Sequence, residues 1–141
     1  MRPKKVILCV DDNEQELSVL KFMLTINAYR VLEASSGLEA IRIFGSAPQV
    51  DLVLADTNMP QMSGGRLVER LKRMASHVPM VLLSDAPTAT GEIHVADALF
   101  MRKNCSTQEL LELIKRMSAR KRGPRKGAQR IMQETELAAA S

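Results

Sequence analysis

The stretch from Leu52 to Pro60 constrains the fold of this chain more than any other. Its first four residues are small or apolar, and they run directly into Asp56. A short continuous apolar run of this kind is typical of a strand buried on both faces of a parallel sheet. Pro60 cannot continue a central strand. We therefore predict that Asp56 lies at the carboxyl end of a strand, the edge where open α/β sheets bind ligands.

Three further short apolar runs also end in polar residues. In chain order they are Val6–Val10 before Asp11 and Asp12, Met80–Leu83 before Ser84 and Asp85, and Leu99–Met101 before Arg102 and Lys103. Because the carboxyl ends of parallel strands meet at one edge, we expect these polar groups to lie together. Clustered carboxylates form a hard oxygen site that suits Mg²⁺ better than zinc or copper. The pattern therefore predicts phosphate or magnesium chemistry.

Helical stretches separate the apolar runs. Asn13 is a candidate helix cap, and a second strand is expected over residues 29–34. The expected apolar faces of four helices are Leu17, Leu20 and Leu24; Leu38, Ile41 and Phe44; Leu67, Leu71 and Met74; and, after a cap at Ser106, Leu110, Leu113, Ile114 and Met117. The alternation predicts an α/β fold, a doubly wound five-stranded parallel sheet with right-handed crossovers.

The stretch from Ala86 to Ala98 is less regular. It contains Pro87 and Gly91 among threonines, and these residues form helices poorly. Only residues 92–98 are suited to about two helical turns. We expect an irregular or shortened fourth helix here.

Charge divides the chain into two parts. Residues 1–114 hold 12 basic and 14 acidic residues, whereas residues 115–141 hold 8 basic and 2 acidic residues. Apolar residues are sparse between Arg120 and Arg130. We predict a domain over residues 1–119 and a basic tail over residues 120–141 that contributes little to the core. Such a tail is suited to an acidic partner surface or to non-specific contact with nucleic acid.

Other classes of protein are not favoured by the sequence. No apolar stretch approaches the length needed to span a bilayer, so no membrane association is expected. Cys9 and Cys105 do not form a metal-binding spacing. The cytoplasm is the expected location.

Four motifs together resemble those of the receiver domains of bacterial response regulators. They are the pair Asp11-Asp12, the pattern Asp56-x-x-Met59-Pro60-x-Met62-x-Gly64, Ser84 after the fourth strand and Lys103 after the fifth. The resemblance covers about residues 4–119. It implies a flavodoxin-like sheet with strand order 2-1-3-4-5, in a single-domain regulator or a fragment of a longer protein.

The resemblance also implies a role for each site residue. Asp56 would accept a phosphoryl group from a sensor histidine kinase or a phosphotransfer protein, and an unidentified downstream protein would read the result. The implied Mg²⁺ ligands are Asp12, Asp56 and the backbone carbonyl of Asn58, with Asp11 acting through metal-bound water. Lys103 and Ser84 would contact the phosphoryl group. Beyond self-phosphorylation and slow self-dephosphorylation, no enzyme activity is implied.

Phe100 occupies the position of the family's aromatic switch residue. Because phenylalanine has no hydroxyl to satisfy in either state, the residues slightly favour a plain core role for it. The set of residues that responds to phosphorylation is therefore expected to include Ser84, and Phe100 under the switch interpretation.

Three features depart from the family pattern: the shortened fourth helix region described above, Asp85 and Asn104. Asp85 adds a negative charge where the family has a small neutral residue. Asn104 follows Lys103 where the family has proline, often after a cis bond. A cis bond before a non-proline residue costs about 2.5–4 kcal/mol, so we predict a trans Lys103–Asn104 peptide.

Two alternative functions stay open at this point. One is a degenerate receiver that binds proteins without being phosphorylated, which the departures favour and the intact acids, serine and lysine oppose. The other is nucleic-acid association through the basic tail, although that stretch has no interleaved aromatic residues for base stacking.

Overall fold

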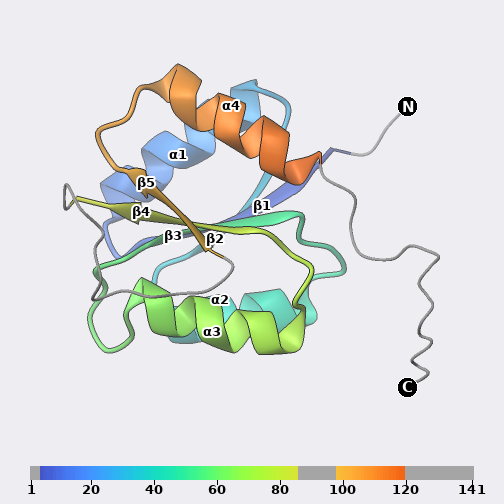
Figure 1. Ribbon diagram of the computed structural model, residues 1–141, viewed down its shortest axis with the longest axis vertical. Helices are drawn as coiled ribbons and strands as arrows, with labels where there is room; N and C mark the ends of the chain where they lie inside the picture. Colours follow the sequence, from blue (N-terminus) through green and yellow to red (C-terminus); the bar gives the residue numbers. More distant parts are fainter. Residues whose placement is uncertain (1–3, 86–97, 120–141) are drawn as a thin grey trace.

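The computed structural model describes residues 4–85 and 98–119. These residues form one five-stranded sheet with helices packed on both faces (Figure 1). The predicted basic tail and most of the predicted irregular segment lie outside the described residues. The division of the chain at residue 119 therefore stays a prediction.

Strands and helices alternate as far as β4, and β5 is the next element after β4 among the described residues. The elements are β1 (Val6–Val10), α1 (Glu14–Ile26), β2 (Arg30–Ala34), α2 (Gly37–Ser46), β3 (Leu52–Asp56), α3 (Gly64–Met74), β4 (Met80–Ser84), β5 (Ala98–Arg102) and α4 (Thr107–Ser118). Ala98 is the first residue of β5, so it does not belong to the short helix expected over residues 92–98. The other residues of that range lie outside the described part of the chain.

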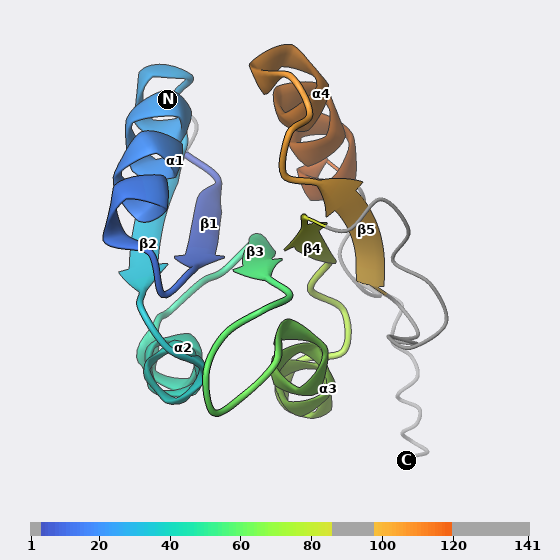
Figure 2. The same ribbon diagram turned by 90° about the vertical axis from the view of Figure 1, so that its left-hand side faces the viewer.

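All neighbouring strands run parallel, in the order β2-β1-β3-β4-β5. This confirms the predicted doubly wound α/β fold and its strand order. Figure 2 shows α1 and α4 on one face of the sheet and α2 and α3 on the other. β1, β3 and β4 are buried along their whole length, which is why their sequences are continuous apolar runs rather than alternating ones.

The sheet separates two apolar cores. Leu52 and Leu54 of β3 point into the core beneath α1 and α4, while Val53 and Ala55 point into the core beneath α2 and α3. This division follows from the alternation of side chains along a strand. β3 therefore contributes side chains to both cores, and Asp56 is the last residue of this buried strand.

Two of the predicted helix faces need correction. Leu38 is 67% exposed and Met74 is 47% exposed. In α2 the buried positions are instead Gly37 and Ala40, whose small size lets the helix approach closely. In α3, Val68 is buried beside the correctly predicted Leu67 and Leu71.

The last helix agrees with its prediction. Ser106 caps α4, and its hydroxyl oxygen accepts from the Glu109 amide while the Glu109 carboxylate accepts from the Ser106 amide. The four predicted apolar residues of α4 are all buried. None of the helices in residues 4–85 and 98–119 is long and apolar enough to cross a membrane.

Candidate functional site

Three carboxylates meet at the carboxyl edge of the sheet. Asp56 is the last residue of β3, and Asp11 and Asp12 directly follow β1, the neighbouring strand. Oxygen atoms of the three side chains all lie within 4.8 Å of one another. Asp11 and Asp56 are buried, whereas Asp12 is exposed. The predicted acid cluster is thus present, with two members fixed in the protein and one facing solvent.

Main-chain amides hold the two buried carboxylates in place. The amide of Asn13 donates to Asp11 Oδ1 at 2.9 Å, and the amide of Asn58 donates to Asp56 Oδ1 at 3.3 Å. Asn13 also caps α1, because its Oδ1 accepts from the amides of Gln15 and Glu16. The turn that begins the first helix therefore also orients Asp11.

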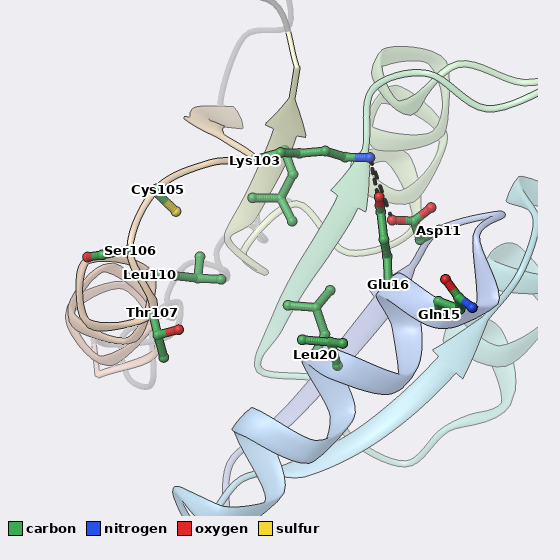
Figure 3. Close-up of a pocket in the computed structure, with 11 residues that line it drawn as sticks. Asp11, Gln15, Glu16, Leu20, Lys103, Cys105, Ser106, Thr107 and Leu110 are labelled. Atoms are coloured by element: carbon green, nitrogen blue, oxygen red, sulfur yellow. Dashed lines mark hydrogen bonds and ion pairs between the residues drawn. The ribbon is translucent and has the colours of Figure 1, made fainter.

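Lys103 brings a positive charge to the acid cluster. It directly follows β5, and its amide donates to the carbonyl of Ser84 at 2.8 Å. Its Nζ lies 3.2 Å from Asp56 Oδ1 and 3.8 Å from Asp11 Oδ2. Its shortest contact is with Glu16 Oε1, at 2.8 Å (Figure 3). The sequence therefore placed Lys103 correctly at the site.

Glu16 was not among the predicted site residues. It lies in the first turn of α1, where an acidic residue is also explained by the helix dipole. The sequence carried one usable signal: Glu16 stands four residues after Asp12 on the helix that begins beside the acid cluster. Only the structure shows that the lysine reaches this turn.

The loop after Asp56 packs tightly against the sheet. The amide and hydroxyl of Thr57 both donate to the carbonyl of Leu83, at 3.0 and 3.2 Å, and the amide of Gly64 donates to the Thr57 carbonyl at 3.0 Å. A Cβ on Gly64 would overlap the carbonyl oxygen of Asp56 and would lie 2.8 Å from Leu82 Cδ2. Glycine therefore lets the start of α3 approach the acid at the strand end.

Burial and neighbouring charges perturb the pKa values at this site. Burial raises the pKa of Asp11 to about 7, and it also raises the pKa of Asp56. The hydrogen bond from Lys103 lowers the pKa of Glu16. Burial opposes the charge on Lys103, but its contacts with Glu16 and Asp56 outweigh this effect and raise its pKa, so the amine is a persistent cation. The site therefore holds excess negative charge that one lysine offsets only in part.

The acid cluster is suited to a divalent cation. Its donors are carboxylate oxygens, the ligand type that Mg²⁺ prefers, and two of them are held rigidly by main-chain amides. An exposed third acid leaves room for the waters that Mg²⁺ usually keeps. The observed residues therefore fit the predicted metal.

The remaining predicted residues lie around this cluster. Ser84 is buried and is the last residue of β4. Asn58 lies two residues after Asp56, in the loop that follows β3, and Asp85 is exposed. Phe100 is half-buried and packs against the core beneath α2 and α3. The described residues contain no cis peptide bond, so the predicted trans Lys103–Asn104 bond is confirmed.

A cavity of about 420 Å³ lies beside the site, between the start of α1 and the start of α4. Glu16 and Lys103 form part of its wall together with apolar residues such as Leu20 and Leu110 (Figure 3). The Glu16–Lys103 contact therefore borders on open space rather than on packed core.

Comparison with known proteins identifies similar chains. The family model for the response regulator receiver domain matches residues 7–115. The rice two-component response regulator ORR7 is 31% identical over 86 residues, which are 60% of this chain and 41% of that protein. The Mycobacterium tuberculosis transcriptional regulatory protein KdpE is 31% identical over 93 residues, which are 66% of this chain and 40% of that protein. The chain thus spans about two fifths of the length of these relatives.

Solved structures agree with this match. A receiver domain protein from Clostridium thermocellum superimposes with a TM-score of 0.70 at 30% identity, covering 81% of this chain and 94% of that one. The response regulator TrrA from Thermotoga maritima, solved in complex with Mg²⁺-BeF, gives a TM-score of 0.72 at 29% identity, covering 80% of this chain and 98% of that one.

Proposed function

This chain belongs to the response regulator receiver domain family of two-component systems, and on that basis we propose that Asp56 is its phosphoacceptor. The phosphoryl group would come from a phosphohistidine on a sensor histidine kinase or a phosphotransfer protein. The observation that carries the proposal is the position of Asp56 at the strand end, 3.2 Å from Lys103 and within the cluster of three carboxylates.

The proposed transfer exchanges one bond to phosphorus for another. An oxygen of the Asp56 carboxylate attacks the phosphorus atom, and the bond between phosphorus and the histidine nitrogen breaks. The bonding electron pair returns to the imidazole ring, and the product on this chain is an acyl phosphate. We propose that Lys103 neutralises charge on the phosphoryl oxygens, a role supported by the 3.2 Å distance from its Nζ to Asp56 Oδ1.

Asp11, Asp12, Asp56 and the backbone carbonyl of Asn58 are the proposed ligands for Mg²⁺. The ion would supply positive charge to a site in which acids outnumber the described cations. The Mg²⁺ named in the TrrA complex supports this choice of metal. Asp11 is proposed to act through metal-bound water.

We further propose that phosphorylation alters a surface read by a partner. The Lys103 amide is hydrogen-bonded to the Ser84 carbonyl, so a shift of either loop toward the phosphoryl group moves the other. Phe100, on β5, is only half-buried, so its side chain has room to change rotamer. Ser84 and Phe100 are therefore the proposed switch residues, and a plain core role for Phe100 is the alternative.

Phosphorylation by a small donor tests the main proposal. Incubation with acetyl phosphate and Mg²⁺ should add the mass of one phosphate to the intact protein. Borohydride reduction should then convert Asp56, and no other acid, into homoserine. Asp56→Asn should abolish the addition, whereas Asp85→Asn, which removes an exposed acid beside the site, should keep it. Labelling that persists in Asp56→Asn refutes the assignment.

The same experiment separates the alternative functions. A folded wild-type protein that takes up no phosphate would favour a phosphorylation-independent binding module. Association with nucleic acid through residues 120–141 remains a separate prediction, since those residues lie outside the described part of the chain. No conventional enzyme activity is proposed, and a cytoplasmic location also stays a prediction.

A further inference from the structure

Lys103 has a partner that the phosphoryl transfer does not require. Its Nζ lies 2.8 Å from Glu16 Oε1, closer than to Asp56 at 3.2 Å or Asp11 at 3.8 Å. Glu16 belongs to α1 and does not end a strand, and it is not one of the proposed metal ligands. The shortest ion pair of the lysine is therefore made outside the phosphoacceptor cluster.

The three carboxylates around Lys103 differ in their freedom to move. The side chains of Asp11 and Asp56 are only 3% and 6% exposed, and main-chain amides hold both. The side chain of Glu16 is 46% exposed and borders the cavity between α1 and α4. Glu16 also shares a side-chain hydrogen bond with Asp11, but as the most exposed of the three it is the partner that can leave Lys103 without moving a strand.

Charge places Glu16 in competition with a phosphoryl group. A phosphoryl group carries about −1.5 to −2 charges and needs the same ammonium that Glu16 now holds. The Glu16 carboxylate repels that group while it neutralises the lysine. Glu16 and a phosphoryl group therefore compete for the ammonium group of Lys103.

We propose that Glu16 is a positioning residue that slows phosphorylation, an inference that rests on the proposed function of Asp56. In the unphosphorylated domain Glu16 pairs with Lys103 while the same ammonium group also lies beside Asp56, and Glu16 releases the lysine when the phosphoryl group reaches Asp56. The rate of phosphorylation is then set in part by a side chain that contacts neither the phosphorus atom nor the metal.

A matched pair of variants tests this inference. Glu16→Gln keeps the size of the side chain and removes its charge. Glu14→Gln makes the same change in the same helical turn, but Glu14 lines a different cavity, with Ser18 and Glu33, and has no described contact with Lys103. We expect acetyl phosphate to label Glu16→Gln roughly two- to fivefold faster than wild type, the effect of a half-exposed ion pair. Glu14→Gln should be labelled at the wild-type rate.

The salt dependence of the phosphorylation rate distinguishes this electrostatic role of Glu16 from a purely structural one. Because the Glu16–Lys103 contact is half-exposed, ions should screen it. The ratio of the Glu16→Gln rate to the wild-type rate should therefore fall toward one between low and high salt. Thermal melts at each salt concentration establish that both variants remain folded.

The possible failures can be distinguished. If wild type takes up no phosphate, the proposed function fails, and this inference fails with it. If wild type is labelled on Asp56 but Glu16→Gln is labelled no faster, only the role of Glu16 is refuted. An equal acceleration in Glu14→Gln also refutes it, because the effect would then be one of general charge.

Discussion

A methyl group added at Gly64 should destabilise the domain, whereas the same group added at Gly45 should stabilise it. A Cβ at Gly64 would meet main-chain atoms of Asp56 and Thr57 as well as Leu82 Cδ2 at 2.8 Å. Main-chain atoms at a strand end cannot move aside separately, so the start of α3 must shift. Overpacking of this kind costs about 1–3 kcal/mol.

At Gly45 the surroundings differ. A Cβ there would come near only Met74 Cε, at 3.3 Å, and Met74 is a flexible, half-exposed side chain that can yield. Alanine favours the helix over glycine by about 0.5–1 kcal/mol. Gly64 is the first residue of α3, where this preference of the helix interior does not apply, so the expected loss there remains about 1–3 kcal/mol.

Urea unfolding of wild type, Gly64→Ala and Gly45→Ala measures both effects under one set of conditions. The unfolding midpoint should fall for Gly64→Ala and rise for Gly45→Ala, with unchanged slopes. Gly64→Ala should also be phosphorylated more slowly, since Asp56 moves with the loop. A Gly64→Ala protein as stable as wild type would refute the argument that close packing at the strand end requires glycine.

Three further predictions address the metal, the pH dependence and the tail. Mg²⁺ should raise the melting temperature of wild type and should do so far less in Asp12→Ala; an equal rise would place the ion elsewhere. Burial raises the folded-state pKa of Asp11 from 3.8 to about 7, so the metal-free folded domain binds more protons than the unfolded chain between these values. Its free energy of unfolding should therefore rise as pH falls from about 8 to about 5.5, measured by urea midpoints, and Asp11→Asn should flatten this dependence; a wild-type midpoint independent of pH would contradict it. Removal of residues 120–141 should leave the melting temperature and Asp56 labelling unchanged while weakening any salt-sensitive association with nucleic acid, followed across a salt series; a large loss of melting temperature would show instead that the tail packs on the domain.

The sequence predicted those parts of the structure that depend on local pattern. Continuous apolar runs identified the buried strands β1, β3 and β4, and the polar residues after the apolar runs identified Asp11, Asp56 and Lys103 as neighbours at one edge. This worked because parallel strands bring their carboxyl ends together whatever lies between them. The predicted faces of α2 and α3 were partly wrong, because large apolar residues were expected to be buried and small ones were overlooked. Gly37 and Ala40 are the buried residues of α2, and Leu38 is exposed.

The contact between Glu16 and Lys103 was beyond the reach of sequence pattern. The two residues are 87 positions apart, and each has a sufficient local explanation without the other. Glu16 suits the start of a helix, and Lys103 suits a strand end beside acids. The path of a lysine side chain across a sheet edge depends on distances that only the folded chain defines.

The order of the strands in the sheet affects when each part of the site can form during synthesis. β1 and β3 pair directly, so Asp11, Asp12 and Asp56 can come together as soon as the first half of the chain has left the ribosome. The ammonium group that offsets their charge arrives only with β5, which adds at the far side of β4. In a nascent chain whose β1 and β3 pair before β5 has been made, the three acids would therefore lie together without Lys103 beside them. During that interval an ion from solution, rather than a residue of the chain, is the available source of positive charge, and magnesium concentration should influence how early the first three strands associate.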